Sequence, residues 1–408
     1  MADIVVNGNT SGAVTLSAPA VAGTVTVTLP STSGTMLTTA SSTGISGSAI
    51  SSGTVPEAYG GTGTTTGYYG FKNRIINGAM GISQRNGTST VTPGSTDYLT
   101  DRWHVAMSQS SKFTGAQSST APTGFSNSLI ITSSSAYSVL STDYFVVRQA
   151  IEGFNFADCG FGTASASTTT LSFWVRSSLT GAFGGSLYNA TGNRSYPFSY
   201  TINAANTFEQ KTITIAGDTT GTWVGATNGA GIYVSFSLGA GSTFNSTANA
   251  WAGGFYTQPS GSTSVVGTNG ATFYITGVQL EKGSTATSFD YRPFGTELAL
   301  CQRYYAKFSS LSGAYVGFGS GVSTATTSAA IVVKYPVRMR SAPTISQSGT
   351  GIYDAGPVQA VTSIGGSYYG DETLFANINV GTGLTNGNGA IWCGINNASA
   401  YIDLSSEL

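Results

Sequence analysis

ITGVQLEKGSTATSFDYRPFGTELALCQRYYAKF, residues 275–308, is the stretch that decides the fold. Its first part continues an alternation of apolar and polar residues that predicts a half-buried strand, with apolar Phe273, Ile275, Val278 and Leu280. Its second part predicts one short amphipathic helix over 296–308, with Thr296 as N-cap and Glu297 in the first turn, where a negative charge suits the helix dipole. Strand patterns precede and follow it. We therefore expect 275–308 to join two β domains.

Composition places the whole chain among all-β proteins. Its 408 residues include 55 glycines, 21 tyrosines and 20 phenylalanines, and only 8% of them are charged. A disordered chain would be rich in charge and poor in aromatic residues. β-branched and aromatic residues between Gly, Ser and Asn turns are typical of strands. We expect an all-β protein with enough apolar residues for real cores.

Charge and cysteine usage exclude several classes of partner. The formal net charge is −1 with no basic stripe, so we expect no nucleic-acid partner and no attraction to an anionic membrane. No run of roughly 18 apolar residues exists, so no membrane insertion is expected, and the start MADIVVNGNTSG lacks a secretory signal. The cysteines, Cys159, Cys301 and Cys393, are few and far apart, which favours reduced, buried thiols and production in a cytoplasm.

The strand patterns divide the chain into zones. Residues 1–67 hold only Asp3 and Glu57 as charged residues and alternate as short strands near Val14 and Val25. So thin a segment cannot form its own core and needs partner chains. Evenly spaced strands then predict a two-sheet sandwich or jelly roll, at 103–107, 128–132, 144–151, 171–176, 211–215, 231–238 and 272–281. A second series predicts a small terminal sandwich, at 314–318, 329–337, 344–348, 359–364, 374–380, 390–396 and 400–404.

Several of these segments resemble bacteriophage tail fibre proteins. NRIINGAM (73–80), TDRWHV (100–105), LSFWVRSS (171–178) and residues 277–308, in this order, are similar to the carbohydrate-binding-module-like jelly-roll domain of those fibres. Residues 10–67 resemble their N-terminal and shaft regions. KYPVRMRSAPTIS (334–346) resembles the opening of their C-terminal domain.

The resemblance implies an organisation and a set of partners. It implies a virion-attachment and shaft segment at 1–67, a jelly roll at 68–294, a connecting helix at 295–308 and a receptor-binding tip at 309–408. It also implies an intertwined homotrimer, held by a phage tail or adaptor protein at its N-terminus. The tip would meet a host cell-surface glycan or an outer-membrane receptor. The protein would then be a virion component, produced in the host cytoplasm.

No motif predicts catalysis, a metal or a cofactor. A catalytic histidine needs a nucleophile and an orienting acid beside it, so we interpret the single histidine, His104, as an ordinary strand residue. With one histidine and no clustered cysteines, a zinc site is not expected. The sequence contains no G-x-S-x-G, H-E-x-x-H or Walker motif. We therefore expect no catalytic residue, no metal ion and no cofactor.

Two alternatives to a non-enzymatic adhesin stay open. A tailspike-type polysaccharide depolymerase needs two carboxyl groups roughly 5–9.5 Å apart. Asp371 and Glu372 are adjacent, and neighbours on a strand face opposite sides, so they could share a site only in a loop. We expect Glu281 and Asp290 to pair with Lys282 or Arg292 instead. No long repeat of a β-helix is visible. The other alternative is a purely structural virion fibre or decoration protein.

Sugar recognition uses aromatic rings that stack on C–H faces and polar groups that bind hydroxyls. The C-terminal zone concentrates both, at Tyr353, Tyr368, Tyr369, Asp371, Trp392 and Asn396. Tyr368 and Tyr369 flank glycines in an expected loop and are the first choice for a glycan site. Trp392 fits the core of the tip equally well. A second sugar site or a trimer contact could use Trp174, Tyr188, Tyr196, Trp223 or Trp251.

Overall fold

The computed structural model describes residues 4–7, 13–16, 71–310 and 315–408. Residues 1–53 and 54–408 form two separate units, and each is described by itself. In the first unit, β1 (Ile4–Asn7) pairs antiparallel with β2 (Ala13–Leu16), which confirms the strand predicted near Val14. The strand predicted near Val25 and the rest of the shaft predicted up to residue 67 lie outside the described residues.

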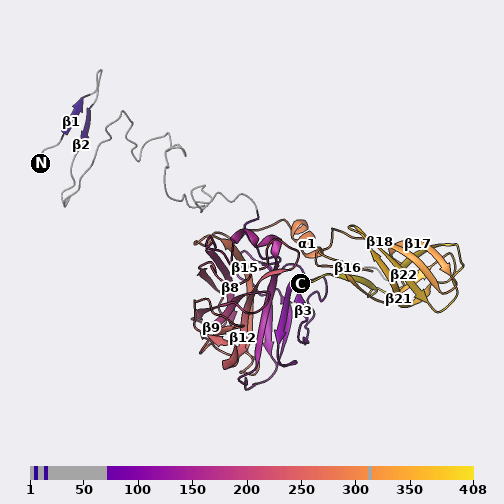
Figure 1. Ribbon diagram of the computed structural model, residues 1–408, viewed down its shortest axis with the longest axis horizontal. Helices are drawn as coiled ribbons and strands as arrows, with labels where there is room; N and C mark the ends of the chain where they lie inside the picture. Colours follow the sequence, from indigo (N-terminus) through magenta and orange to yellow (C-terminus); the bar gives the residue numbers. More distant parts are fainter. Residues whose placement is uncertain (1–3, 8–12, 17–70, 311–314) are drawn as a thin grey trace. The chain divides into compact units, whose positions relative to one another are not determined.

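Residues 98–282 form a sandwich of two antiparallel sheets (Figure 1). One sheet has the strand order β10 (Ser195–Ile202), β9 (Gly181–Asn189), β12 (Ala230–Ala240), β7 (Tyr144–Glu152), β4 (Trp103–Met107), β3 (Tyr98–Thr100). The other has the order β11 (Glu209–Ile215), β8 (Thr169–Ser177), β15 (Thr272–Lys282), β6 (Ser128–Ser133), β5 (Phe113–Ser118). A short parallel pair, β13 (Asn245–Ser246) and β14 (Gln258–Pro259), and 3-10 helices at Gly153–Asn155, Ala157–Cys159 and Ser242–Phe244 lie in the connections. The fold is all-β, as expected.

Alternation along the strands builds the sandwich core. In β8, Leu171, Phe173 and Val175 are fully buried while Trp174 and Arg176 are partly exposed, as their period predicts. The cysteines Cys159, Cys301 and Cys393 are free and buried. Sequence reasoning missed β3, β5, β9 and β10. Of these, β9 is rich in glycine and β10 contains Pro197, which suits its place at the edge of the sheet.

The predicted helix is shorter than its spacing suggested. Helix α1 spans Phe294–Gln302, with Pro293 as N-cap in place of the predicted Thr296. Glu297 lies in the first turn as expected. The prediction that the helix continues to residue 308 is wrong, because Tyr305–Ser309 forms β16 and pairs along its length with β24 (Tyr401–Ser405). Backbone pairing with a distant strand overrides the local helical spacing.

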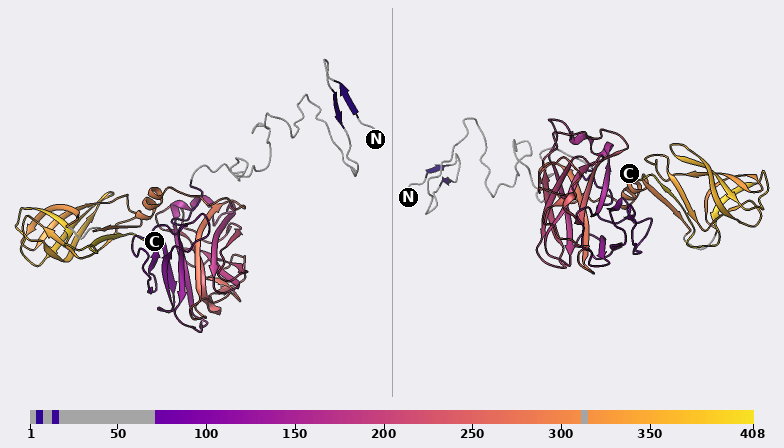
Figure 2. Two further views of the ribbon diagram at one scale, coloured as in Figure 1. Left: turned by 180° about the vertical axis from the view of Figure 1, so that it is seen from behind. Right: turned by 60° about the horizontal axis from the view of Figure 1, so that its bottom comes forward.

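The C-terminal part contains a closed barrel in place of the predicted small sandwich. The barrel order is β17 (Gly317–Ala325), β18 (Ser328–Lys334), β22 (Thr373–Val380), β21 (Gln359–Tyr369), β20 (Thr350–Tyr353), β23 (Gly389–Gly394). A separate sheet is formed by β16, β24 and β19 (Thr344–Ser348). The barrel closes because β23 pairs with β17 on one side and β20 on the other, which leaves no free edge. Figure 2 shows its orange and yellow strands as one bundle.

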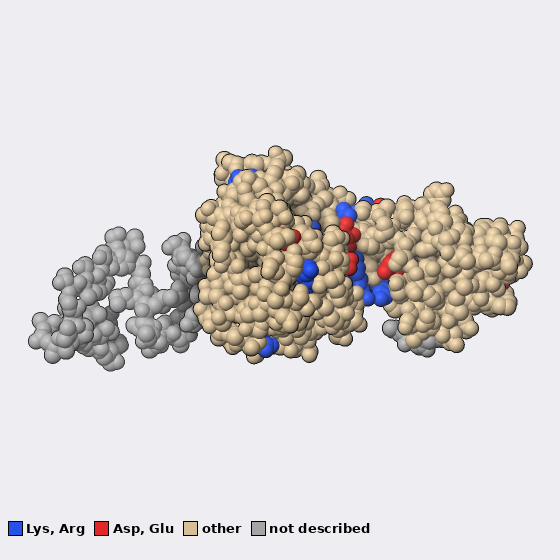
Figure 3. All heavy atoms as spheres, turned by 90° about the horizontal axis from the view of Figure 1, so that it is seen from below, with Lys and Arg blue, Asp and Glu red and all other residues tan. Residues whose placement is uncertain are grey.

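Ion pairs connect the residues around β16 and β24 to the sandwich. Glu407 contacts the buried guanidinium of Arg102 and lies 3.0 Å from Arg85. Arg303, just after α1, donates to Glu152 of β7 at 2.6 Å. These contacts place five charged side chains between the sandwich and the C-terminal strands, and Figure 3 shows blue and red atoms gathered there.

Candidate ligand-binding surface

The outside of the barrel carries one continuous row of exposed, mostly apolar side chains. Strand pairing connects its members in order from Tyr353 to Ile391, Ser320, Val332, Phe375 and Tyr368. Directly paired residues on one face of a sheet lie side by side. We call these six residues the barrel row. Its large members are all exposed, with exposed fractions of 43% for Tyr353, 41% for Ile391, 45% for Val332, 37% for Phe375 and 70% for Tyr368.

The row faces outward because the alternate positions fill the barrel. In β22, Leu374, Ala376 and Ile378 are buried while Phe375 between them is exposed. In β23, Trp392 is fully buried and its neighbour Ile391 is exposed. The period of two therefore leaves a second apolar face in solvent.

A hollow of about 470 Å³ lies at the Tyr353 end of the row. It is lined by Tyr315, Tyr353, Gly356, Pro357, Val358, Ile391 and Cys393. Tyr315 is 59% exposed, so two tyrosine rings are open to solvent at this hollow. The volume falls in the range of roughly 300–1,000 Å³ that is usual for ligand pockets.

The barrel row contains no charged side chain. Between Gly317 and Gly394 the charged residues are Lys334, Arg338, Arg340, Asp354, Asp371 and Glu372. Asp354 is buried and accepts hydrogen bonds from Thr385 N at 2.6 Å and Ser323 Oγ at 3.2 Å. On the face shown in Figure 3 the barrel, at the right, is almost entirely tan. Any ligand of this surface must be recognised without ion pairs from the row.

The structure brings some of the predicted site residues together. Tyr353 and Tyr368 belong to the barrel row, and the rings of Tyr368 and Phe375 are 5.9 Å apart. Tyr368 and Tyr369 lie at the end of β21 rather than in the predicted loop, because they pair with Phe375 and Leu374. Tyr369 is 45% exposed.

Asp371 and Asn396 lie outside the barrel row. Asp371 follows β21 in the connection to β22, where its carboxylate is 3.1 Å from Arg338 Nη2 and both side chains are largely exposed. Asn396 is exposed in the connection after β23 and has a φ of 41°. Both connections are at the surface, but strand pairing does not connect either residue to the row.

Trp392 does not form part of a surface site. Its side chain is fully buried among the apolar residues that fill the barrel, and its Nε1–H donates to Thr350 Oγ1 at 2.8 Å. The prediction of Trp392 as a glycan contact is therefore wrong, because the ring presents no face to solvent. Its chain neighbour Ile391 takes the outward position.

The aromatic candidates of the sandwich serve mostly as packing. Tyr188 and Tyr196 are buried. Trp223 and Trp251 are partly buried and pack edge to face, 5.5 Å apart, while Trp251 Nε1–H donates to Ala216 O at 2.7 Å. Trp174 is partly exposed on β8. These rings form no open platform comparable to the barrel row.

Titratable groups in the sandwich are engaged in packing contacts. His104 is buried, stacks on Tyr98 and accepts a hydrogen bond from Arg148 Nε at 3.2 Å. Burial and the adjacent Arg148 hold the pKa of His104 well below its usual 6.5, so the imidazole is neutral.

The described residues contain no group of three or more His, Cys, Asp or Glu side chains suited to a metal ion. In that same part of the chain, no helix is long and apolar enough to span a bilayer.

Two of the predicted acidic pairings are wrong. Glu281 accepts hydrogen bonds from Gln279 and Thr287 rather than pairing with Lys282. Arg292 pairs with Glu297 at 3.2 Å, and Asp290 accepts from Asn73 N. The first-turn position of Glu297 brings its carboxylate close to Arg292, which leaves Asp290 with a backbone partner.

Sequence reasoning missed Val332, Phe375 and Ile391. Each stands between buried residues of its strand, so alternation within IVVK, TLFANI and AIWC assigns it to the outer face. What alternation does not give is the register between strands. The row exists because the strand order and register of the barrel place these residues side by side.

Comparisons with known proteins give limited likenesses. No protein-family model matches the chain, and no curated protein matches its sequence. The fold is similar to the enzymatically active domain of tailspike protein 4 of bacteriophage CBA120, at 15% identity and a TM-score of 0.30, over 52% of this chain and 22% of the tailspike. It is also similar to TmCBM61 in complex with β-1,4-galactotriose, at 10% identity and a TM-score of 0.27, over 52% of this chain and 100% of that module. A putative sugar-binding protein from Bacteroides thetaiotaomicron VPI-5482 has 12% identity and a TM-score of 0.30, over 52% of this chain and 100% of that protein.

Proposed function

We propose that the protein is a non-enzymatic adhesin of the bacteriophage tail fibre type that binds a glycan through the outside of its C-terminal barrel. The barrel row carries this proposal. Contiguous exposed apolar surface on a folded protein marks a site of interaction, and this row is continuous over neighbouring strands, with a hollow at one end.

The chemistry of the row suits an uncharged sugar chain. Tyrosine rings stack on the C–H faces of sugars and offer a hydroxyl at the rim. Ser320 lies within the row, and Tyr353 and Tyr368 are at its two ends. Because the row has no charge, binding should depend little on ionic strength.

The rest of the proposal concerns assembly. The N-terminal segment attaches to a phage tail or adaptor protein, and the chain forms a homotrimer in the virion after synthesis in the host cytoplasm. Three barrels on one fibre would engage a repetitive cell-surface glycan together. Linked weak sites gain avidity of about 10²–10⁴ over single sites when the geometry permits simultaneous engagement.

The proposal is tested by staining bacterial cells with the fluorescently labelled full-length chain. A panel should pair wild-type strains with mutants that lack surface polysaccharide. We expect staining of at least one wild-type strain, loss of staining in its polysaccharide mutant, and a drop of at least tenfold for the double variant Tyr353→Ala, Tyr368→Ala.

The matched control is Phe154→Ala, which removes a ring that is 58% exposed on the sandwich. It should stain as well as the unaltered chain. Equal staining of all strains, or full staining by the Tyr353→Ala, Tyr368→Ala variant, would refute binding by the barrel row. Failure to stain any strain would favour a purely structural role.

A further inference from the structure

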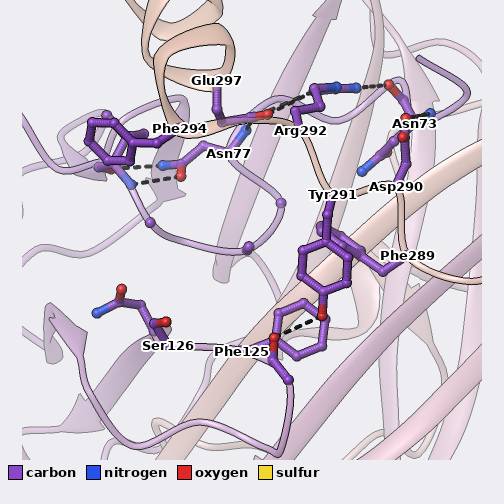
Figure 4. Close-up of a pocket in the computed structure, with 16 residues that line it drawn as sticks. Asn73, Asn77, Phe125, Ser126, Phe289, Asp290, Tyr291, Arg292, Phe294 and Glu297 are labelled. Carbon is purple, nitrogen blue, oxygen red and sulfur yellow. Dashed lines mark hydrogen bonds and ion pairs between the residues drawn. The ribbon is translucent and has the colours of Figure 1, made fainter. Parts of the chain in front are cut away.

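A second cavity lies where the sandwich meets the start of α1 (Figure 4). Its volume is about 250 Å³. The rings of Phe125, Phe289 and Tyr291 pack together on one side, with centroids 4.9–5.5 Å apart. Phe294, the first residue of α1, lies on a different side of the hollow.

Two of these rings keep their faces open to solvent, and one of them, Tyr291, is fixed by a hydrogen bond. Tyr291 is 59% exposed, yet its hydroxyl donates to Gly124 O at 2.9 Å, so the ring is fixed at both ends. Phe294 is 68% exposed. A large ring that is exposed although its neighbours pack into a cluster is a surface on which a flat apolar face can stack.

The wall between the rings is rigid. Asn77 Nδ2 donates to Ile82 O and to Asp101 O at 2.8 Å each, and Val278 N donates to Gly78 O at 3.0 Å. The backbone at Gly78 packs directly against Val278 O, so a side chain there would clash. The hollow is therefore formed before any ligand arrives, which lowers the entropic cost of binding.

The polar groups of the cavity include acceptors and donors without protein partners. Asp290 Oδ2 accepts from Asn73 N at 3.2 Å, while its Oδ1 accepts no hydrogen bond from the described residues. Ser126 and Asn127 also line the cavity, and the side chain of neither makes a hydrogen bond within the described part of the chain. Arg292 is paired with Glu297 and donates to Ile75 O, so its charge is already neutralised.

We propose that this cavity binds a single uncharged sugar ring. Aromatic faces flanked by one carboxylate oxygen, an amide and a hydroxyl match the alternating C–H faces and hydroxyl groups of a hexose. An acidic sugar would meet Asp290 and find no free cation, so it is disfavoured. The volume is below the usual roughly 300–1,000 Å³ of drug-sized pockets, which suits one ring and not an oligosaccharide. The site shares no residue with the barrel row, so the two proposals stand separately.

Gly81 provides a direct way to close the cavity. It lines the hollow, has no unusual φ, and a Cβ built on it meets no atom within 4 Å. The variant Gly81→Leu should therefore fold normally and fill the space. Gly253→Leu is the matched control, because Gly253 is equally open and lies outside the cavity.

The test is saturation-transfer NMR on the full-length chain with glucose, galactose and mannose at tens of millimolar. Cyclohexanol serves as a neutral non-sugar ring. We expect transfer to at least one hexose, with the dissociation constant raised at least tenfold by Gly81→Leu and by Phe294→Ala, and unchanged within twofold by Gly253→Leu. Thermal melts would confirm that all three variants are folded.

Three results would overturn the proposal. The first is no transfer to any of the hexoses. The second is transfer to cyclohexanol alone, which would mean an apolar cavity without sugar recognition. The third is hexose binding that survives Gly81→Leu and is lost in Tyr353→Ala, Tyr368→Ala. That result would place the sugar on the barrel row and leave the proposed adhesin function intact.

Discussion

Ile391 and Trp392 are neighbours in β23, and they show how position outweighs residue type. Tryptophan is a common sugar-binding ring, which is why Trp392 stood among the predicted contacts. Alternation places it in the barrel and places the less suggestive Ile391 outside. The strand period was readable in the sequence, but which of its two phases faces inward depends on the closed barrel. Residue chemistry alone therefore pointed to Tyr353 and Tyr368 of the barrel row and did not point to Ile391, Val332 or Phe375.

Trp392→Ala should cost stability rather than specific binding. Removing a fully buried large aromatic side chain leaves a cavity, with an expected loss of about 3–5 kcal/mol in unfolding free energy. Tyr368→Ala, at 70% exposure, should change it by less than about 0.5 kcal/mol. Denaturant titrations of the full-length variants measure both. Equal stability of Trp392→Ala and the unaltered chain would contradict the placement of this ring in the core.

His104 should make the free energy of unfolding depend on pH near neutrality. It is the single histidine of the chain, and histidine is the side chain whose ordinary pKa lies between about pH 5 and 8. Its folded-state pKa is depressed by burial and by Arg148, so the unfolded chain takes up the proton first as pH falls. Stability should therefore decrease as pH falls below about 6.5, by up to about 1.4 kcal/mol per unit.

The measurement is the unfolding free energy at pH 7.5 and pH 5.5 for the unaltered chain and for His104→Gln. The buried Asp101 has a raised pKa, mainly from burial, and acts in the opposite direction. It is present in both proteins, so the difference between them isolates His104. In His104→Gln the unfolding free energy should not show this decrease at low pH. An identical pH dependence in the two proteins would show that His104 is not buried in the neutral form.

Among the elements, local pattern predicted strands better than it predicted their partners. Every sandwich strand predicted from alternation is present, from β4 to β15. Strands β3, β5, β9 and β10 were not predicted, and β9 and β10 lack a clear apolar period because glycine and proline interrupt it. Residues 305–308 have helical spacing, and only the distant strand β24 makes them extended. Barrel closure is likewise a long-range property that no single strand displays.

Two glycines of the barrel offer a test of how closely β17 and β18 approach each other. A Cβ at Gly321 would collide with Ala330 O of the neighbouring strand, whereas one at Gly389 would meet no atom within 4 Å. Gly321→Ala should therefore cost about 1–3 kcal/mol through overpacking, and Gly389→Ala less than about 0.5 kcal/mol. Denaturant midpoints of the full-length variants measure both losses of stability. A neutral Gly321→Ala would argue against this close approach of β17 and β18.

At the scale of the whole molecule, charge is placed unevenly. Ion pairs join the sandwich to the C-terminal strands, and the barrel row has no charged residue. Such a molecule suits contact with an uncharged surface. The sequence could not show which of the many exposed rings lie together, because that depends on register and closure.

The proposed homotrimer predicts a definite mass. Sedimentation equilibrium of the full-length chain should give three times 41.6 kDa. Because the barrel row is proposed as a glycan site, the Tyr353→Ala, Tyr368→Ala variant should keep that mass. A monomeric unaltered chain would contradict the trimer. A trimer that dissociates in this variant would identify the row as a subunit contact.

Binding without turnover is the central claim, and one measurement tests it most directly. Polysaccharide purified from a stained strain is titrated into the full-length chain by calorimetry, and the same mixture is assayed over a day for new reducing ends. The account predicts saturable binding that Tyr353→Ala, Tyr368→Ala abolishes, with no release of reducing ends. Release of reducing ends that stops in Asp371→Ala, Glu372→Ala would contradict it and establish a depolymerase.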